Sequence, residues 1–329
     1  MNHINGIKDY EHATGMLEYN MTNNYMFVAV LQEDKFALKG LVASLLHMQP
    51  EEIKDITILN PIIPGADIDL KEFILDVSLT FNDDHIVNLE MQVKNKGNWI
   101  PRSISYLCRE WDRIEKGKDY ELAPTAYQIG FLDFTLFKDH PEFYATYRLR
   151  NTGDGYEYSD KFTLSVVELN HIDMATDEDR KYGIDRWARL FKSTTWEEVK
   201  MLASNDEYIM SAARSMYAKE MDEATLRLCR KTKEEIAGDE YRAQRLIELE
   251  KQISELETTA SELDAKNSSL LDKNASLETK NASLETKNAS LETKNVSLET
   301  KNASLETKNA SLETELNELR ERIKQLENK

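Results

Sequence analysis

Two acidic residues and an amide stand where they could act together on a phosphate ester. Asp76 opens the run Asp-Val-Ser-Leu-Thr-Phe, and Glu90 and Gln92 belong to the run Asn-Leu-Glu-Met-Gln-Val-Lys. Paired carboxylates are hard oxygen ligands of the kind that Mg²⁺ and Mn²⁺ prefer. A metal ion held by them polarises a phosphoryl oxygen and generates hydroxide, and Gln92 is placed to orient the attacking water or a phosphate. A metal site of this kind is one interpretation of these residue types.

The two runs alternate as the strands of a β-hairpin do. Apolar residues occupy every second position, so one face of the hairpin is apolar and the other is polar. The link at residues 82–84, Asn-Asp-Asp, is a turn signal. A turn centred on the middle of this link makes cross-strand residue numbers sum to about 166, which places Asp76 opposite Glu90 and Ser78 opposite Asn88. The predicted apolar face comprises Val77, Leu79, Phe81, Leu89, Met91 and Val93.

The predicted pairing of Asp76 with Glu90 needs an explanation, because like charges directly opposite each other destabilise a sheet. The two carboxylates either reach into bulk water, share a proton, or hold a cation between them. A plain amphipathic hairpin with a solvated polar face accounts for the pattern without any site. Periodicity alone leaves these alternatives open.

Several stretches of the chain resemble one nuclease family. An Asp on one strand, a short turn and Glu-x-Gln on the next strand resemble the PD-(D/E)xK nuclease superfamily, and the match is closest to its recombination-promoting nuclease and transposase family. The stretches at 21–53, 98–112 and 127–149 add to the resemblance, which covers roughly residues 20–230. The catalytic motif is short, so the combination of stretches is the more specific feature.

The resemblance implies an α/β fold with a restriction-endonuclease-like core, in which helices flank a mixed sheet. It also implies DNA cleavage linked to recombination, with Mg²⁺ or Mn²⁺ as the cofactor. Asp76 and Glu90 then match the two metal-binding acids, and the backbone carbonyl of Met91 matches a third ligand. Gln92 falls where most of the superfamily has Lys, although Glu-x-Gln is usual in this family. A Gln side chain cannot stabilise the charge that develops in the transition state as the ammonium group of Lys does. Gln92 therefore bears on the rate of DNA cleavage more than on the fold.

Other residues near the motif have less certain roles. The family's first helix often carries an Asp in a D-x-x-F-like segment, whereas residues 23–27 here read Asn-Asn-Tyr-Met-Phe and contain no acid. Lys94, Lys96 and Arg102 are candidates for binding the phosphates of a nucleic acid, and for each the alternative is a solvated basic residue. Trp99 lies in a predicted loop, and its side chain could either pack against the domain or stack on a base.

The C-terminal part of the chain is a heptad repeat. The unit KNASLET recurs from residue 273 to 314, and leucines stand seven residues apart from Leu249 to Leu326. With Leu at d, the a positions of the central heptads are all Asn. This pattern predicts a long parallel coiled coil that makes the protein a homodimer. Lys at g and Glu at e, such as Lys280 and Glu285 of a partner, offer weak interhelical pairs. The predicted organisation is an N-terminal tail at 1–19, a nuclease-like domain at 20–230 and a coiled coil at 231–329.

Composition narrows the class of protein. The net charge is −18, and residues 241–329 hold 14 basic and 17 acidic residues, so residues 1–240 carry most of the excess. This balance argues against a generic polyanion-coating protein, whose footprint is basic, and it leaves open a nucleic acid that is held through a local patch and a bound cation. Cys108 and Cys229 form no motif, which favours reduced thiols. No apolar run of membrane length and no leader-like segment is present. We therefore expect a cytoplasmic protein with no membrane partner and no small-molecule cofactor.

Three hypotheses follow from the sequence. The first is a Mg²⁺-dependent DNA endonuclease, which acts as a dimer so that two sites cut both strands of a duplex. The second is a weak or inactive nuclease fold that binds DNA or protein. The third gives the main role to the repeat itself, as a spacer or a surface that captures a partner.

Overall fold

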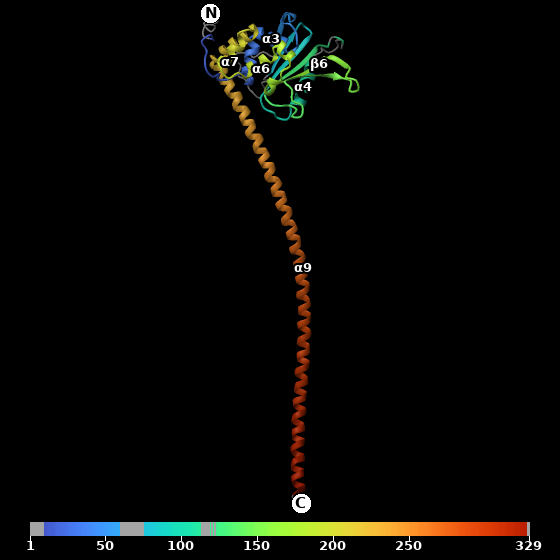
Figure 1. The fold of residues 1–329 in the computed structure, drawn as a ribbon. Coiled ribbons are helices and arrows are strands. Elements are labelled where there is room, and N and C mark those ends of the chain that lie inside the picture. The colour runs from blue at the N-terminus through green and yellow to red at the C-terminus, as the bar shows by residue number, and fades with distance from the viewer. Residues whose placement is uncertain (1–9, 60–75, 113–118, 120, 122, 328–329) are drawn as a thin grey trace. The chain divides into compact units, whose positions relative to one another are not determined.

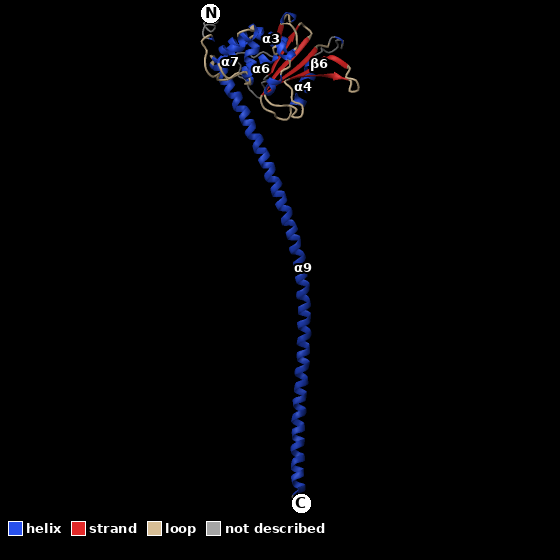
Figure 2. Cartoon of the chain, viewed as in Figure 1, coloured by secondary structure: helices blue, strands red, loops and turns tan. Residues whose placement is uncertain are grey.

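The structure is a computed structural model, and it describes residues 10–59, 76–112, 119, 121 and 123–327 of the 329-residue chain. The chain divides into two compact units, residues 1–241 and 242–329. The first unit is an α/β domain, and the second consists of helix (Figures 1 and 2). No helix in the described part of the chain has the length and apolarity needed to cross a bilayer.

The α/β domain is built on a mixed six-stranded sheet with the strand order β1-β2-β3-β4-β6-β5. The three central strands β3, β4 and β6 are parallel to one another, and the other pairings are antiparallel. A mixed sheet flanked by helices was the predicted architecture, and it is confirmed. The strands are β1 (Ile56–Ile58), β2 (Asp76–Phe81), β3 (His85–Gln92), β4 (Thr125–Leu132), β5 (Tyr144–Arg150) and β6 (Glu157–Glu168).

The β2–β3 hairpin has the predicted register. Asp76 pairs with Glu90 and Ser78 with Asn88, as a turn centred at residue 83 requires. Asn82 and Asp83 adopt positive φ values of 51° and 65°, a conformation that Asn and Asp tolerate better than most residues. Residues 73–75 of the predicted first strand lie outside the described residues.

The apolar face of the sheet forms the main core with one group of helices. Val77, Leu79 and Leu89 are fully buried there. The ring of Phe131 on β4 lies 5.6 Å from that of Phe27 and 5.1 Å from that of Phe191, in edge-to-face contacts. The helices that contribute to this core are α2 (Asn24–Glu33), α3 (Lys35–Leu45), α6 (Ile184–Lys192), α7 (Trp196–Ala203) and α8 (Glu207–Glu220). Trp187 and Trp196, which as large aromatic residues are expected in the core more than at a ligand site, are buried among them.

The sequence predicts a helix over 177–192 with an apolar stripe of Ile184, Trp187, Leu190 and Phe191, then a helix opened by a capping box of Thr195 and Glu198, and a further helix over about 206–230. The first and the last of these helices are wrong as continuous elements. The stretch 177–192 is divided at Gly183, which has a φ of 75° and separates α5 (Asp177–Tyr182) from α6. Glycine adopts this left-handed conformation without a steric cost, so it ends one helix and re-aims the next. The stretch 206–230 is divided after α8, because the Asp222 carboxylate accepts hydrogen bonds from the Ala224 and Thr225 amides and starts α9. The capping box predicted at Thr195 and Glu198 is confirmed.

The opposite face of the sheet is covered by α4 (Trp99–Trp111). Trp99 on this helix packs with Leu132 and Val166, which alternate with the residues of the main core along β4 and β6. The central strands β3 and β4 are therefore buried on both faces, as expected where parallel strands form the centre of a sheet.

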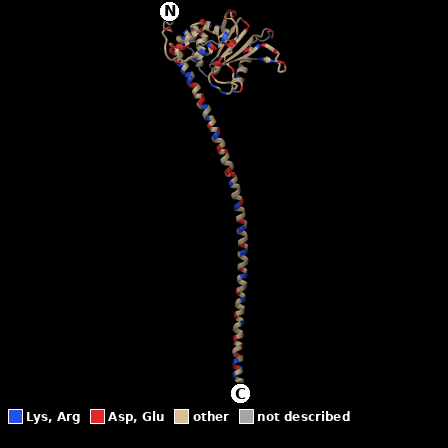
Figure 3. Cartoon of the chain, viewed as in Figure 1, with Lys and Arg blue, Asp and Glu red and all other residues tan. Residues whose placement is uncertain are grey.

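The last helix, α9 (Glu223–Glu327), is 105 residues long. Its first turns belong to the α/β domain, where the Asn23 amide donates to the Cys229 carbonyl at 3.0 Å. In the second unit, the leucines of the heptad stripe are about half exposed, for example Leu277 at 51% and Leu284 at 50%. Acidic and basic residues alternate along this part of the helix (Figure 3).

The two thiols are expected to differ in reactivity. Burial raises the pKa of the Cys229 thiol to about 12, whereas Cys108 on α4 is exposed. At pH 8 a thiol-specific reagent should therefore modify one thiol per native chain within minutes, and both thiols after unfolding in urea, because the thiolate is the reactive species. Mass spectrometry of the labelled peptides measures this. Equal labelling of both peptides in the native protein would contradict the burial of Cys229.

Candidate functional site

The polar face of the β2–β3 hairpin is buried. Ser78, Asn88, Glu90 and Gln92 have exposed fractions of 3%, 1%, 3% and 8%. The reason is that α4 lies across this face of the sheet, which the local sequence pattern does not show. The interpretation of the hairpin as a plain surface element with a solvated polar face is therefore wrong. A buried carboxylate needs hydrogen-bond or charge partners, and Glu90 has them on α4 and β4.

Glu90 contacts a guanidinium and an amide. Arg102 on α4 donates from Nη2 to Oε1 of Glu90 at 2.8 Å, a length typical of charge-assisted hydrogen bonds. Gln128 on β4 approaches the other carboxylate oxygen with its Nε2 at 3.5 Å, which is at the limit of a hydrogen bond. The Oε1 atom of Gln128 accepts from Asn88 at 2.9 Å. These contacts fix the orientation of the Gln128 amide so that its NH₂ group faces Glu90.

Gln92 presents an oxygen on the same face. Its Nε2 donates to the Lys94 carbonyl at 3.1 Å, and its buried Oε1 has no hydrogen-bond partner within the described part of the chain. The Gln92 carbonyl accepts from the amide of Asp133 at the end of β4. Because successive carbonyls of a strand point to opposite edges, the Met91 carbonyl points toward the β2 edge, where Asp76 lies.

Asp76 is placed by its backbone. It is the first residue of β2 and the register partner of Glu90. Its side chain lies outside the described part of the chain. Among the residues that are described, no group of three His, Cys, Asp or Glu side chains could by itself hold a metal ion. A site of the predicted kind therefore depends on oxygens of mixed origin, namely the carboxylates of Asp76 and Glu90 and the Met91 carbonyl, with Gln92 Oε1 beside them on the same face. Oxygen donors of this type fit Mg²⁺ or Mn²⁺.

Trp99 is a packing residue. It opens α4 and is only 2% exposed, so it is not available for stacking on a base. Its indole lies directly over Gly130, the register partner of Glu90 on β4. A glycine is required at this position because a side chain would occupy the space of the indole. The pair of Trp99 and Gly130 thus determines how closely α4, and with it Arg102, approaches the sheet.

Replacing Gly130 should therefore loosen the site. A Cβ at this position would lie 2.0 Å from the indole carbon Cζ2 of Trp99, so Gly130→Ala must displace α4. We expect an unfolding free energy lower by about 1–3 kcal/mol, the usual cost of overpacking, as measured by urea denaturation. Gly153→Ala is the matched control, since the nearest atom there is 3.4 Å away. Equal stability of the two variants would contradict the close packing of α4.

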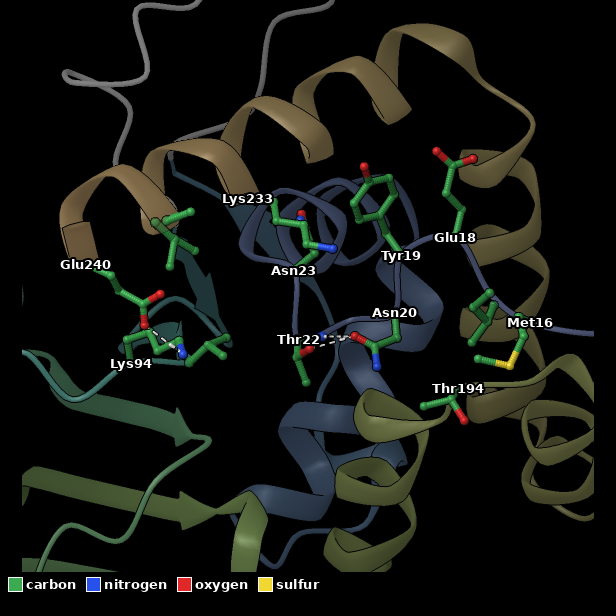
Figure 4. Close-up of a pocket in the computed structure, with 14 residues that line it drawn as sticks. Met16, Glu18, Tyr19, Asn20, Thr22, Asn23, Lys94, Thr194, Lys233 and Glu240 are labelled. Carbon is green, nitrogen blue, oxygen red and sulfur yellow. Dashed lines mark hydrogen bonds and ion pairs between the residues drawn. The ribbon is translucent and has the colours of Figure 1, made fainter.

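Lys94 and Lys96 already have acidic partners. Lys94 forms an ion pair with Glu240 and Lys96 with Asp239, both at 2.7 Å. Figure 4 shows the pair of Lys94 and Glu240 beside a cavity of about 430 Å³. The hydrogen bond and charge of Glu240 raise the pKa of Lys94 above its ordinary value. Both lysines are positioned at the end of β3, and nucleic-acid phosphates would have to compete with these acids. The cavity wall includes Leu17, Thr22, Asn23, Lys94, Lys233 and Glu240.

A second buried carboxylate lies at the end of β6. Glu168 accepts from the Leu136 amide at 3.0 Å and lies 3.4 Å from Nε2 of His171. Burial raises the pKa of the Glu168 carboxyl, against the lowering effect of the Leu136 hydrogen bond. Thr135 approaches the same His171 nitrogen at 2.8 Å. A Ser-His-Asp type relay needs contacts at both ring nitrogens, so this cluster is not arranged as one.

Sequence reasoning missed Gln128 and the contact between Arg102 and Glu90. Gln128 is fully buried on β4. The available signal was a single amide within the mostly apolar run Ala-Tyr-Gln-Ile-Gly-Phe-Leu. The Arg102 contact depends on how α4 crosses the sheet. The sequence around Arg102 does not predict the angle or position at which α4 crosses the sheet.

The fold and the position of the acids define a class. A mixed α/β sheet that carries Asp76 and a buried Glu90 on adjacent strands of a hairpin is the arrangement expected for a nuclease-like core. Residues 22–245 match the family model described as PD-(D/E)XK nuclease family transposase, and the chain belongs to this family. The searches with this chain matched no curated protein and no solved structure.

Proposed function

We propose that this protein is a metal-dependent DNA endonuclease that promotes recombination. The observation that carries the proposal is the pairing of Asp76 with Glu90 on β2 and β3 of a chain of this family. The buried Oε1 of Gln92 on the same face, which has no hydrogen-bond partner among the residues that the structure describes, supports it. Two acids at paired positions repel each other, and a divalent cation held between them would relieve that repulsion.

The chain's own residues have distinct roles in this proposal. Asp76, Glu90 and the Met91 carbonyl hold Mg²⁺ or Mn²⁺, which when bound polarises the scissile phosphate and lowers the pKa of a water molecule. Gln92 orients that water or a phosphate oxygen through its amide. Gln128 keeps the Glu90 carboxylate oriented. The burial of this face by α4 limits the access of bulk water, which strengthens electrostatic interactions within the site.

We infer that DNA phosphates are contacted by Lys94, Lys96 and Arg102, which are near the end of β3 or on α4. The two lysines would exchange Glu240 and Asp239 for phosphate oxygens. A parallel coiled coil of residues 231–329 would join two nuclease-like domains, each formed by residues 20–230, and the leucine stripe of α9 is the surface that a second copy would cover. The cytoplasm is the compartment that fits this role.

Plasmid cleavage tests the proposal. Purified full-length protein should convert supercoiled DNA to nicked and linear forms with Mg²⁺ or Mn²⁺, and the conversion should stop on addition of EDTA. Gel electrophoresis over a time course measures the rate. Equal nicking in EDTA would refute the proposal.

A second candidate function is a DNA- or protein-binding module with weak or no catalysis. Gln92 at the usual Lys position favours it, as do the acid-free segment at 23–27 and the occupied Lys94 and Lys96. Salt-dependent binding of DNA without turnover in either metal would identify this function.

A further inference from the structure

We propose that Arg102 is the internal counter-ion of Glu90, and that it competes with the divalent cation for this carboxylate. The inference rests on the proposed function, because the cation concerned is the one assigned there to Asp76 and Glu90. It adds a role for Arg102 in setting the cation affinity, which is separate from contacting DNA.

The contact between the two side chains is strongly asymmetric. The Glu90 side chain is 4% exposed, whereas that of Arg102 is 39% exposed. A carboxylate so far from water needs a positive or hydrogen-bonding partner close to it. The guanidinium of Arg102 at 2.8 Å is such a partner, and it is much closer than the Gln128 amide at 3.5 Å.

A divalent cation and the Arg102 guanidinium cannot both contact the Glu90 carboxylate, because the two positive charges would repel each other. Mg²⁺ binds carboxylate oxygens at about 2.0–2.1 Å, so a cation on Glu90 would be within a few Å of the Arg102 charge. Repulsion at such distances is strong where water is excluded. Cation binding therefore requires Arg102 to move away from Glu90, and the lost ion pair weakens the measured affinity.

Arg102 is built so that it can leave. Its side chain is partly solvated, and its Cζ lies 5.1 Å from the centre of the Tyr106 ring. An aromatic face supports a guanidinium in more than one position. By contrast, Glu90 is on a central strand and cannot follow it. The guanidinium is thus the mobile member of the pair.

Displacement couples the two ligands of the site. An Arg102 released from Glu90 offers its planar fork of donors to a phosphate. A phosphate that draws Arg102 away in turn frees Glu90 for the cation. By linkage the two binding events strengthen each other by the same factor, so the cation is bound more tightly when DNA is present.

Cation affinity measured on the full-length chain tests the inference. Titration calorimetry with MnCl₂ in the absence of DNA should give a dissociation constant about tenfold lower for Arg102→Met than for the wild type, equivalent to about 1.4 kcal/mol. Glu90→Gln should weaken binding in the wild-type and Arg102→Met backgrounds alike. Arg102→Gln, which keeps one donor for Glu90, should change the affinity in the same direction and serves if Arg102→Met does not fold.

Arg109→Met is the matched control. Arg109 is also on α4 and lies over the same Tyr106 ring at 5.6 Å, so this variant removes an equal charge from the same helix. Salt screens such an exposed charge, and we expect its Mn²⁺ affinity to stay within about twofold of the wild type. Equal affinities of the Arg102 and Arg109 variants, or no Mn²⁺ binding by either Arg102 variant, would overturn the inference. The proposed function would still stand if the wild type cuts plasmid DNA with Mg²⁺.

Discussion

Asp76→Asn and Glu90→Gln should each lower the rate of Mg²⁺-dependent plasmid cleavage by about a thousandfold, since several kcal/mol of transition-state stabilisation is lost with the cation. Each substitution keeps the shape of the side chain and removes one charged ligand. Glu90→Gln also leaves Arg102 without its partner at 2.8 Å, so circular dichroism must first show that the variant is folded. The rate of supercoiled DNA loss at saturating Mg²⁺ measures the effect.

Asp83→Asn is the matched control for these variants. Asp83 lies in the turn of the same hairpin, and Asn tolerates its positive φ of 65°. This variant should cut DNA at the wild-type rate. If all three variants lose activity equally, damage to the hairpin explains the loss and the proposed roles of Asp76 and Glu90 fail. If none loses activity, catalysis occurs elsewhere on the chain.

Replacing three central seam residues should greatly stabilise the coiled coil. Asn281, Asn288 and Asn295 are at a positions, where a parallel dimer buries them at a cost in stability. Ile at these three positions would bury six additional apolar side chains per dimer, at about 2 kcal/mol each, for a gain on the order of 10 kcal/mol. Ile at a with Leu at d also preserves the two-stranded state. Helix melting followed by circular dichroism at several protein concentrations measures the gain.

The same residue type placed outside the seam provides the control. Thr279, Thr286 and Thr293 are at f positions, where each hydroxyl donates to the backbone carbonyl four residues earlier at 2.9 to 3.0 Å. Ile at these positions should leave the melting temperature close to that of the wild type. Sedimentation should report dimers in both cases. Equal melting of the two triple variants would show that the leucine stripe is not the surface covered by a second copy.

The hairpin could be predicted because the features that determine it lie within one short segment of the sequence. Alternation fixes which residues share a face, and the turn at 82–84 fixes the register, so the pairing of Asp76 with Glu90 followed from the sequence. The burial of the polar face did not follow, because it depends on α4, which reaches the sheet through the contact of Trp99 with Gly130. No periodicity in either segment records that contact.

The helical breaks show the same division between local and tertiary information. The apolar stripe from Ile184 to Phe191 was correctly assigned to the core, but the positive φ of Gly183 was not inferred, and two helices were joined. The capping box at Thr195 was found because its two residues lie within one turn. The acids that meet Lys94 and Lys96 lie more than 140 positions further along the chain, and only the folded structure brings them together.

The heptad-repeat part of the uninterrupted helix α9 can change length only in fixed steps if its leucine stripe is to stay in phase. Adding or removing one KNASLET unit changes its length by about 10.5 Å, seven residues at about 1.5 Å each. Such a change keeps Leu249 and Leu326 in phase on the same stripe, because the unit equals one heptad. Variation in the number of units would therefore be structurally silent at both ends of the helix. Selection could adjust the length of this helix without redesigning its interface, whereas a gain or loss that is not a multiple of seven residues would rotate one end of the stripe relative to the other.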